Sequence, residues 1–271
     1  MLHGGGQTRH AWHSTAIGLA DAGWRAITVD LRGHGESTHP RPPAYALEDF
    51  AADVRAVIAS VAGEPVVIGA SLGGIAGVLA ITEPPQASAA GLVLVDVAHR
   101  FQPRGGGRIV SFMDAHPDGF VSLADAAEAV AAYLPQRERP RDPSGLRHNL
   151  RRNGDGRWIW HWDPEILTHA RPLIQDQAQL SERLTTAVTR LRQPCLLVRG
   201  ADSDVLTAGI AREFIELAAN AALAEVPHAG HMVAGDNNDA FSRAIRAWLD
   251  TPALRTPPRP TTAGAPRVRS G

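Results

Sequence analysis

The chain has 271 residues, of which 44% are hydrophobic and 20% are charged, and its formal net charge is −1. This length and apolar content suffice for a large buried core and exclude a chain that is disordered throughout. The near-neutral charge gives no electrostatic drive toward nucleic acid or an anionic membrane surface. We therefore expect a protein that acts on a small molecule, with no nucleic-acid or membrane partner, as a monomer or a homodimer.

The cysteine content and the absence of long apolar runs bear on the compartment. A single cysteine, Cys195, excludes an internal disulfide framework and favours the cytoplasm. No stretch approaches the roughly 18 apolar residues of a membrane span, and the N-terminus lacks the basic and then apolar pattern of an export signal. We expect a cytoplasmic protein.

Strands and helices alternate over the first hundred residues. Short β-branched runs are separated by amphipathic or small apolar stretches, which is typical of parallel βαβ units. The pattern predicts strands at 25–30, 65–69 and 91–96, and helices at 47–61 and 72–81.

The alternation stops at residue 98 and resumes after residue 193. The intervening segment has helical patterns at 122–133 and 180–191 but no convincing strand alternation. The pattern then predicts a strand at 195–199, a helix at 208–219, a strand at 222–226 and a helix at 238–249. We interpret 1–97 and 194–250 as a doubly wound α/β core with a mostly parallel sheet, and 98–193 as a helical cap over the carboxyl ends of the strands. The Pro-, Thr- and Arg-rich tail, 251–271, is predicted to be disordered.

The strongest chemical motif is GASLGG at 69–74, between a predicted strand and a predicted helix. A G-x-S-x-G motif in this context places its serine, here Ser71, on a sharp turn as a nucleophile. The start of the following helix directs backbone N–H groups, including that of Leu72, to the place where an oxyanion forms.

A second glycine motif, HGGG, occupies 3–6. Consecutive glycines before a helix can leave one N–H free to complete an oxyanion hole with that of Leu72. We expect Gly5 to be the donor, with Gly6 as the alternative. His34, in the loop DLRGHGES at 30–37, is interpreted as structural rather than as a base or a metal ligand.

A serine hydroxyl needs a neighbouring base before it can act as a nucleophile. His231, in PHAGHM at 227–232, lies between the last predicted strand and the last predicted helix, and it can therefore reach the carboxyl edge of the sheet beside Ser71. His228 is the alternative.

Taken together and in this order, LHGGG, DLRGHGES, GASLGG and the late GHM resemble the motifs of the α/β-hydrolase superfamily. The resemblance implies an eight-stranded, mostly parallel sheet, a nucleophile–acid–histidine triad and a helical cap between strands 6 and 7. Serine in the elbow argues against the branches that use an aspartate nucleophile. No Cys–His or carboxylate cluster has the spacing of metal ligands, so we expect neither a metal nor a cofactor.

The resemblance leaves two main candidates for the triad acid. In most of the superfamily the acid follows strand 7, where this chain has Asp202, Ser203 and Asp204. In other branches it follows strand 6, where Asp96 stands 25 residues after Ser71. Either carboxylate could fix the tautomer of the histidine. We favour Asp96 and keep Asp204 as the alternative, with Asp202 a distant third.

The predicted cap contains Trp158, Trp160 and Trp162 at alternating positions, which indicates an extended segment with one aromatic face. This face either packs in the cap or lines a substrate pocket. Seven arginines lie in the same region, and one that turned inward could bind a substrate carboxylate; they are Arg137, Arg139, Arg141, Arg147, Arg151, Arg152 and Arg157.

These features predict a serine hydrolase that cleaves a carboxylic ester or a related small acyl substrate. A C–C bond hydrolase, a lactonase, a perhydrolase, a cofactor-free dioxygenase or a slow-turnover ligand receptor could use the same triad. Superfamily members also carry three strands before the position of His3, and the third lies beside the strand that carries the nucleophile. Their absence predicts an empty position in the sheet and a poorly soluble or inactive chain, unless other strands close the gap.

Overall fold

The computed structural model describes residues 1–137 and 142–255. Its main sheet has four strands, all parallel, in the order β1-β2-β5-β6. The predicted doubly wound α/β architecture is present, but the described residues form four strands of this sheet rather than the implied eight. The strands are β1 Val66–Ala70, β2 Gly91–Val95, β5 Cys195–Gly200 and β6 Ala221–Val226.

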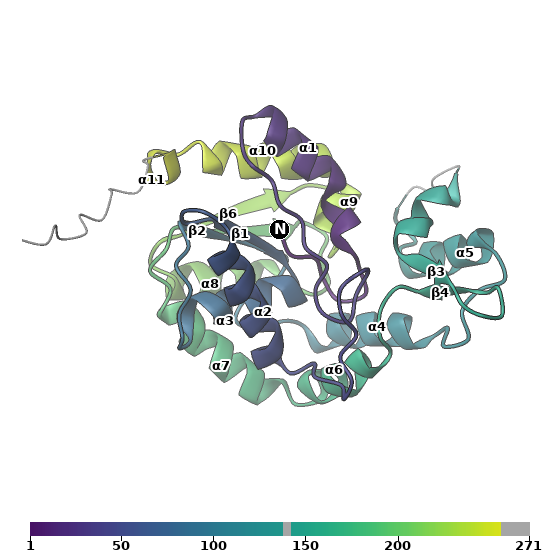
Figure 1. Ribbon diagram of the computed structural model, residues 1–271. Coiled ribbons are helices and arrows are strands. Elements are labelled where there is room, and N and C mark those ends of the chain that lie inside the picture. The colour runs from purple at the N-terminus through teal and green to yellow at the C-terminus, as the bar shows by residue number, and fades with distance from the viewer. Residues whose placement is uncertain (138–141, 256–271) are drawn as a thin grey trace, which may run out of the picture.

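Helices cover both faces of this sheet (Figure 1). One face packs against α1 (His13–Asp21) and α10 (Asn238–Leu249), and the other packs against a second group of helices. β2 is buried along its whole length because both of its faces are covered. The second group is α2 Leu47–Ser60, α3 Leu72–Thr82, α7 Gln177–Thr189 and α8 Ala208–Leu217.

The predicted strand at 25–30 is wrong, because this extended segment pairs at one residue only. Val29 forms a parallel bridge with Leu2, and Leu2 forms a second bridge with Gly69 of β1. The N–H of Leu2 donates to the carbonyl of Ile68, and the N–H of Ala70 donates to the carbonyl of Leu2. The position beside β1 is therefore filled only near the carboxyl end of that strand.

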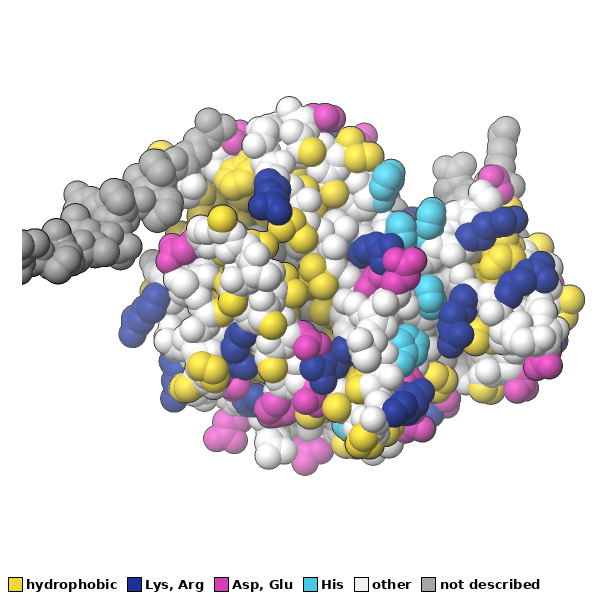
Figure 2. Space-filling model, viewed as in Figure 1, with side chains coloured by type: hydrophobic (Ala, Val, Ile, Leu, Met, Phe, Trp, Pro, Cys, Tyr) yellow, Lys and Arg dark blue, Asp and Glu magenta, His cyan; other side chains and the backbone are white. Residues whose placement is uncertain are grey.

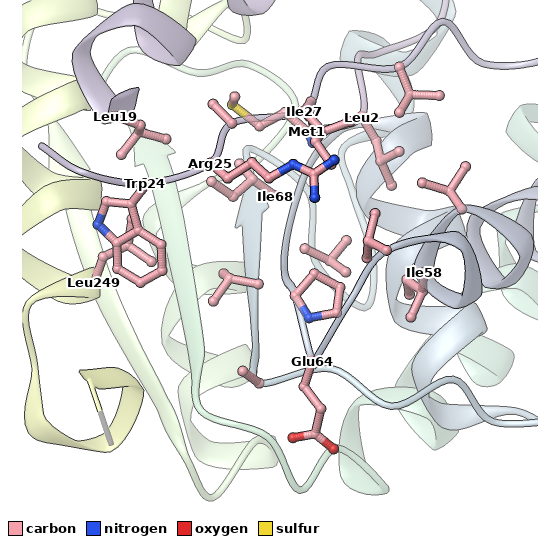
Figure 3. Close-up of a pocket in the computed structure, with 18 of the residues that line it drawn as sticks. Met1, Leu2, Leu19, Trp24, Arg25, Ile27, Ile58, Glu64, Ile68 and Leu249 are labelled. Atoms are coloured by element: carbon pink, nitrogen blue, oxygen red, sulfur yellow. Dashed lines mark hydrogen bonds between the residues drawn. The ribbon is translucent and has the colours of Figure 1, made fainter. Parts of the chain in front are cut away.

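Below Leu2, an apolar groove lies between β1 and the extended segment (Figure 3). It has a volume of about 460 Å³, and Trp24, Ile27, Ile58 and Ile68 are among its lining residues. The predicted gap in the sheet is thus closed at the end of β1 that carries Ser71, and it is open along the rest of that strand.

A lobe inserted between β2 and β5 projects from the core (Figure 1). Its predicted helix at 122–133 matches α5 (Leu123–Tyr133), and the tryptophan-rich segment pairs as a small antiparallel sheet, β3 (Leu150–Arg152) with β4 (Trp158–Trp160). The lobe also contains two helices that the sequence pattern does not predict, α4 (Pro103–Asp114) and α6 (Glu165–Gln175).

The predicted cap boundary at residue 193 includes one helix that belongs to the core, since α7 packs against α3 and α8. The predicted disorder from residue 251 is also wrong at its start. Pro252–Arg255 form the short helix α11, and residues 256–271 lie outside the described part of the chain. The remaining short helices are η1 Arg9–Trp12, η2 Pro143–His148 and α9 Val233–Asp236. Among the described residues, no helix is long and apolar enough to cross a membrane.

Candidate active site

The turn between β1 and α3 holds Ser71 in an unusual backbone conformation. Its φ of 46° and ψ of −117° lie outside the regions that most residues adopt. A Cβ at Gly69 would lie 2.5 Å from the carbonyl oxygen of Gly73, and a Cβ at Gly73 would lie 2.6 Å from that of His3. Only glycine fits at both positions, so the sequence of the turn dictates its tightness. Ser71 stands at the carboxyl end of β1, immediately before the first N–H groups of α3.

Asp96 follows β2, the strand next to β1, and contacts His231. The distance between Asp96 Oδ2 and His231 Nδ1 is 2.8 Å. The N–H of Gly200 donates to Asp96 Oδ1 over 3.0 Å, and the side chain of Asp96 is fully buried. A buried carboxylate on Nδ1 selects the tautomer in which Nδ1 carries the proton and Nε2 is free to accept one.

Ser203 is a further partner of this carboxylate, which the sequence motifs do not predict. Its hydroxyl donates to Asp96 Oδ2 over 2.5 Å and accepts from the N–H groups of Val205 and Leu206. Ser203 occupies the position after the seventh strand where the resemblance places the acid in most relatives. This position in the motif is the only sequence signal that could have pointed to Ser203.

The alternative site residues lie elsewhere. Asp204 pairs with Arg108 of α4 at 3.0 Å and is nearly half exposed, and Asp202 is exposed. His228 is exposed and has a positive φ of 54°. Of the candidates considered for each role, the structure brings together Asp96 and His231.

The loop that carries His231 is held by Asp236. The N–H of Gly230 donates to Asp236 Oδ2 over 2.9 Å. Burial raises the pKa of the Asp236 carboxyl above its usual value, which the hydrogen bond from Gly230 and the charge of Arg137 partly oppose. Arg137, from the end of the inserted lobe, donates to the carbonyl of Gly235 over 2.7 Å and lies 3.9 Å from Asp236.

The glycine loop at 4–6 lies next to Ser71. A Cβ at Gly4 would meet Cβ of Ser71 at 3.4 Å, whereas one at Gly5 would meet nothing within 4 Å. The N–H of Gly4 donates to Gln7 Oε1, and the N–H of Gly6 donates to His34 Nε2 over 3.1 Å. Among the described residues, the N–H of Gly5 has no acceptor.

Two buried histidines support this loop. His3 Nδ1 lies 2.8 Å from the carbonyl oxygen of Gly4, and His3 Nε2 accepts from the N–H of Leu31. Burial lowers the pKa of His3 to about 4 and that of His34 to about 3, and the proximity of the two rings contributes to the second shift. Both rings are therefore neutral at pH 7. The interpretation of His34 as structural agrees with this geometry.

Ser71, Gly5 and His231 line one cavity of about 350 Å³ between the core and the inserted lobe. The lobe contributes mainly apolar and aromatic side chains: Ile109, Phe112, Met113, Val130, Tyr133, Leu134, Leu146 and Trp160. Histidine side chains lie along the boundary between the two parts (Figure 2), where His10 and His148 stack with ring centroids 4.2 Å apart. The cavity thus combines a polar floor with an apolar roof.

Of the three cap tryptophans, Trp160 lines the cavity. Trp162 stacks on Trp160 at 4.8 Å and is buried in the core cluster, whereas Trp158 lies under the guanidinium groups of Arg147 and Arg152. Trp158 and Trp162 are not among the residues that line the cavity.

The arginines of this region are mostly engaged outside the cavity. Arg157 donates to backbone carbonyls of the lobe, and Arg137 lines the cavity. Arg139 and Arg141 lie outside the described residues. In the described part of the chain, no group of three or more His, Cys, Asp or Glu side chains could hold a metal ion.

Comparison with known proteins gives a consistent family. The model of the alpha/beta hydrolase family matches residues 1–244. Esterase Rv0045c of Mycobacterium tuberculosis is 30% identical over 93% of this chain and 82% of the esterase. The 2-(acetamidomethylene)succinate hydrolase of Mesorhizobium japonicum is 27% identical over 92% of this chain and 87% of that enzyme.

Solved structures show the same fold. A crystal structure of E-2-(acetamidomethylene)succinate hydrolase superposes with a TM-score of 0.79 at 22% identity, covering 92% of this chain and 90% of that one. A crystal structure of esterase Rv0045c superposes with a TM-score of 0.71 at 30% identity, covering 92% and 83% of the two chains.

Proposed function

Because this chain belongs to the alpha/beta hydrolase family, we propose that it is a serine hydrolase that cleaves small carboxylic esters through an acyl-enzyme. The observation that carries the proposal is that Asp96 contacts His231, and that His231 lines the same cavity as Ser71. Neither residue of the contact is close to Ser71 in sequence. A histidine held by a buried carboxylate, in the same cavity as a serine with a strained backbone, is the arrangement that nucleophilic catalysis requires.

In the proposed mechanism, Ser71 Oγ attacks the ester carbonyl while His231 Nε2 takes the hydroxyl proton. Asp96 keeps Nδ1 protonated and stabilises the imidazolium that forms. The N–H groups of Gly5 and Leu72 bind the oxyanion of the tetrahedral intermediate. His231 then gives its proton to the leaving alcohol and activates a water molecule, which hydrolyses the acyl-enzyme and frees Ser71.

The cavity favours a neutral, apolar substrate group. Its roof is built from Phe112, Met113, Trp160 and their aliphatic neighbours, and such surfaces bind apolar acyl or alcohol groups by excluding water. The volume of about 350 Å³ suits a small ligand.

Arg137 is the feature that would favour an acidic substrate, like the substituted succinate named in one relative. Its guanidinium already donates to the carbonyl of Gly235 and faces Asp236. A substrate carboxylate would have to displace these contacts. We therefore propose neutral substrates, and the esterase relative supports esters as the substrate class.

Active-site labelling and ester turnover test the proposal together. A fluorophosphonate probe should modify Ser71, as mass spectrometry of the wild-type chain would show, and Ser71→Ala should remain unlabelled. The wild-type chain should also release p-nitrophenol from apolar p-nitrophenyl esters.

His231→Asn and His228→Asn form a matched pair for this experiment, because both remove an imidazole from the same loop. The first should abolish turnover, and the second should leave it unchanged. Saturable ester binding without turnover, or equal loss of turnover in both variants, would refute the proposed function.

A further inference from the structure

Hydrogen bonds hold the glycine loop on both sides of Gly5. Before it, the N–H of Gly4 donates to Gln7 Oε1, and the carbonyl of Gly4 accepts from His3 Nδ1 and from the N–H of Gln7. After it, the N–H of Gly6 donates to His34 Nε2. The loop is therefore fixed by side chains and one backbone hydrogen bond rather than by a helix or a strand.

The contact with Gly6 determines the tautomer of His34. An imidazole nitrogen that accepts from an N–H carries no proton, so Nε2 of His34 is unprotonated. The proton lies on Nδ1, which donates to the carbonyl of Arg32 over 3.0 Å. Both polar atoms of this fully buried ring are thus used.

The backbone of Gly6 has a φ of +76°, and a Cβ at this position would lie 3.3 Å from the sulfur of Met113. The loop is therefore confined on the cavity side by the inserted lobe and on the core side by His34. A shift of the loop toward His34 or away from it would move the amide of Gly5.

We propose that His34 is a positioning residue of the oxyanion hole, which takes the N–H of Gly6 and so leaves the N–H of Gly5 as the loop's donor to the oxyanion. This inference rests on the proposed function. It gives His34 a role in catalysis without contact with the substrate, and it explains why Gly5 rather than Gly6 is the donor.

Three ionisable side chains interact electrostatically with the ring of His34. The ring of His3 lies 4.9 Å away, and His39 and Asp30 also interact with it electrostatically. Asp30 is paired with Arg9, so its charge is largely balanced. A proton on Nε2 of His34 would place two donors face to face at Gly6, which the buried site cannot accommodate.

The test uses two substitutions of His34 and one control. His34→Leu removes the acceptor for Gly6. His34→Gln provides an amide oxygen at a reach similar to that of Nε2, together with a donor for the carbonyl of Arg32. His13→Gln removes an exposed histidine and serves as the control.

For His34→Leu, kcat should fall about 100-fold with KM nearly unchanged, since an oxyanion donor acts in the transition state. His34→Gln should restore kcat to within about tenfold of wild type, and His13→Gln should match wild type. If His34→Leu is folded and keeps wild-type kcat, or if glutamine and leucine are equally impaired, the proposal is overturned.

NMR supplies a readout that does not depend on turnover or on the folding of the leucine variant. In the wild-type chain, the imidazole nitrogens of His34 should show a protonated Nδ1 and an unprotonated Nε2. In the phosphonate adduct of Ser71, the amide proton of Gly5 should move downfield and that of Gly6 should not. A shift at Gly6 instead would overturn the proposal, whereas a failure of the wild-type chain to react with the phosphonate would refute the proposed function itself.

Discussion

Replacing the triad acid by its amide gives a decisive test of the site. In Asp96→Asn, the amide oxygen would remain at Oδ1, because the N–H of Gly200 donates there. The amide nitrogen would then replace Oδ2 and face both His231 Nδ1 and the hydroxyl of Ser203 with a donor where an acceptor is needed. The imidazole must respond by leaving Nδ1 unprotonated, which puts its proton on Nε2.

A histidine with its proton on Nε2 cannot accept the proton of Ser71. We therefore expect kcat to fall about 10⁴-fold, which corresponds to about 5.5 kcal/mol of lost transition-state stabilisation. The variant should stay folded, since the substitution preserves shape and keeps a partner for Gly200. Asp204→Asn should change kcat by less than about twofold, because Asp204 forms an exposed ion pair with Arg108 and such pairs contribute about 1 kcal/mol at most to stability.

The assay is steady-state hydrolysis of a p-nitrophenyl ester by both variants, with circular dichroism and thermal unfolding as the controls for folding. The reasoning is refuted if folded Asp96→Asn retains more than about 10% of wild-type kcat, or if Asp204→Asn is the more damaging change. Either result would mean that the 2.8 Å contact between Asp96 and His231 does not orient the base.

Three further predictions concern stability and turnover. Burial lowers the pKa values of His3 and His34 to about 4 and about 3, so below pH 6.5 the unfolded chain binds protons that the folded chain does not. In urea titrations, the free energy of unfolding should therefore fall by about 4 kcal/mol from pH 8 to pH 5. It should fall by about half as much in His34→Gln, which lacks one of the two histidines. A flat pH profile would contradict this. Gly73→Ala should lower the free energy of unfolding by more than about 2 kcal/mol, because the added Cβ would lie 2.6 Å from the carbonyl oxygen of His3. The control is Gly18→Ala in α1, whose Cβ meets no atom within 4 Å; it should be neutral or stabilising in the same denaturant titration. Ser203→Ala should lower kcat about tenfold without raising KM, by removing the hydroxyl that donates to the triad carboxylate, and an unchanged kcat would show that this hydrogen bond is dispensable.

Most elements of the core could be predicted from the sequence because their signals are local. The strand before Ser71 and the glycines after it specify a tight turn, whatever lies around them. The segment at 25–30 has the same β-branched character, yet it finds a partner only at Val29, because a strand requires a neighbour along its length.

The sequence of α4 does not predict a helix, because its local signal points away from the structure that forms. Its sequence contains three consecutive glycines, which disfavour a helix in isolation. In the fold, a Cβ at Gly105 would lie 2.6 Å from the carbonyl oxygen of Asp204, so glycine is needed for the helix to approach that loop. Tertiary packing overrides local propensity there.

The sequence favours Asp96 as the acid but leaves Asp204 open, because both residues follow strands that end at the same edge of the sheet. What separates them is the direction of each side chain. Asp96 has a positive φ of 50° and is buried on His231, whereas Asp204 is drawn toward Arg108. These contacts join segments more than 90 residues apart in the chain, beyond the reach of any local pattern.

The partial pairing of β1 divides that strand into two halves that differ in hydrogen bonding. Two hydrogen bonds join its carboxyl end to Leu2. Peptide groups alternate in direction along a parallel strand, so those of Val66 face the same way as those of Ile68 and Ala70. At Val66 that side is the groove rather than a neighbouring strand. Deuterium should therefore exchange quickly at the Val66 amide and slowly at that of Ala70, only four residues away. The strand that presents the nucleophile would then be rigid at its carboxyl end, where the chemistry occurs, and would open readily at its amino end.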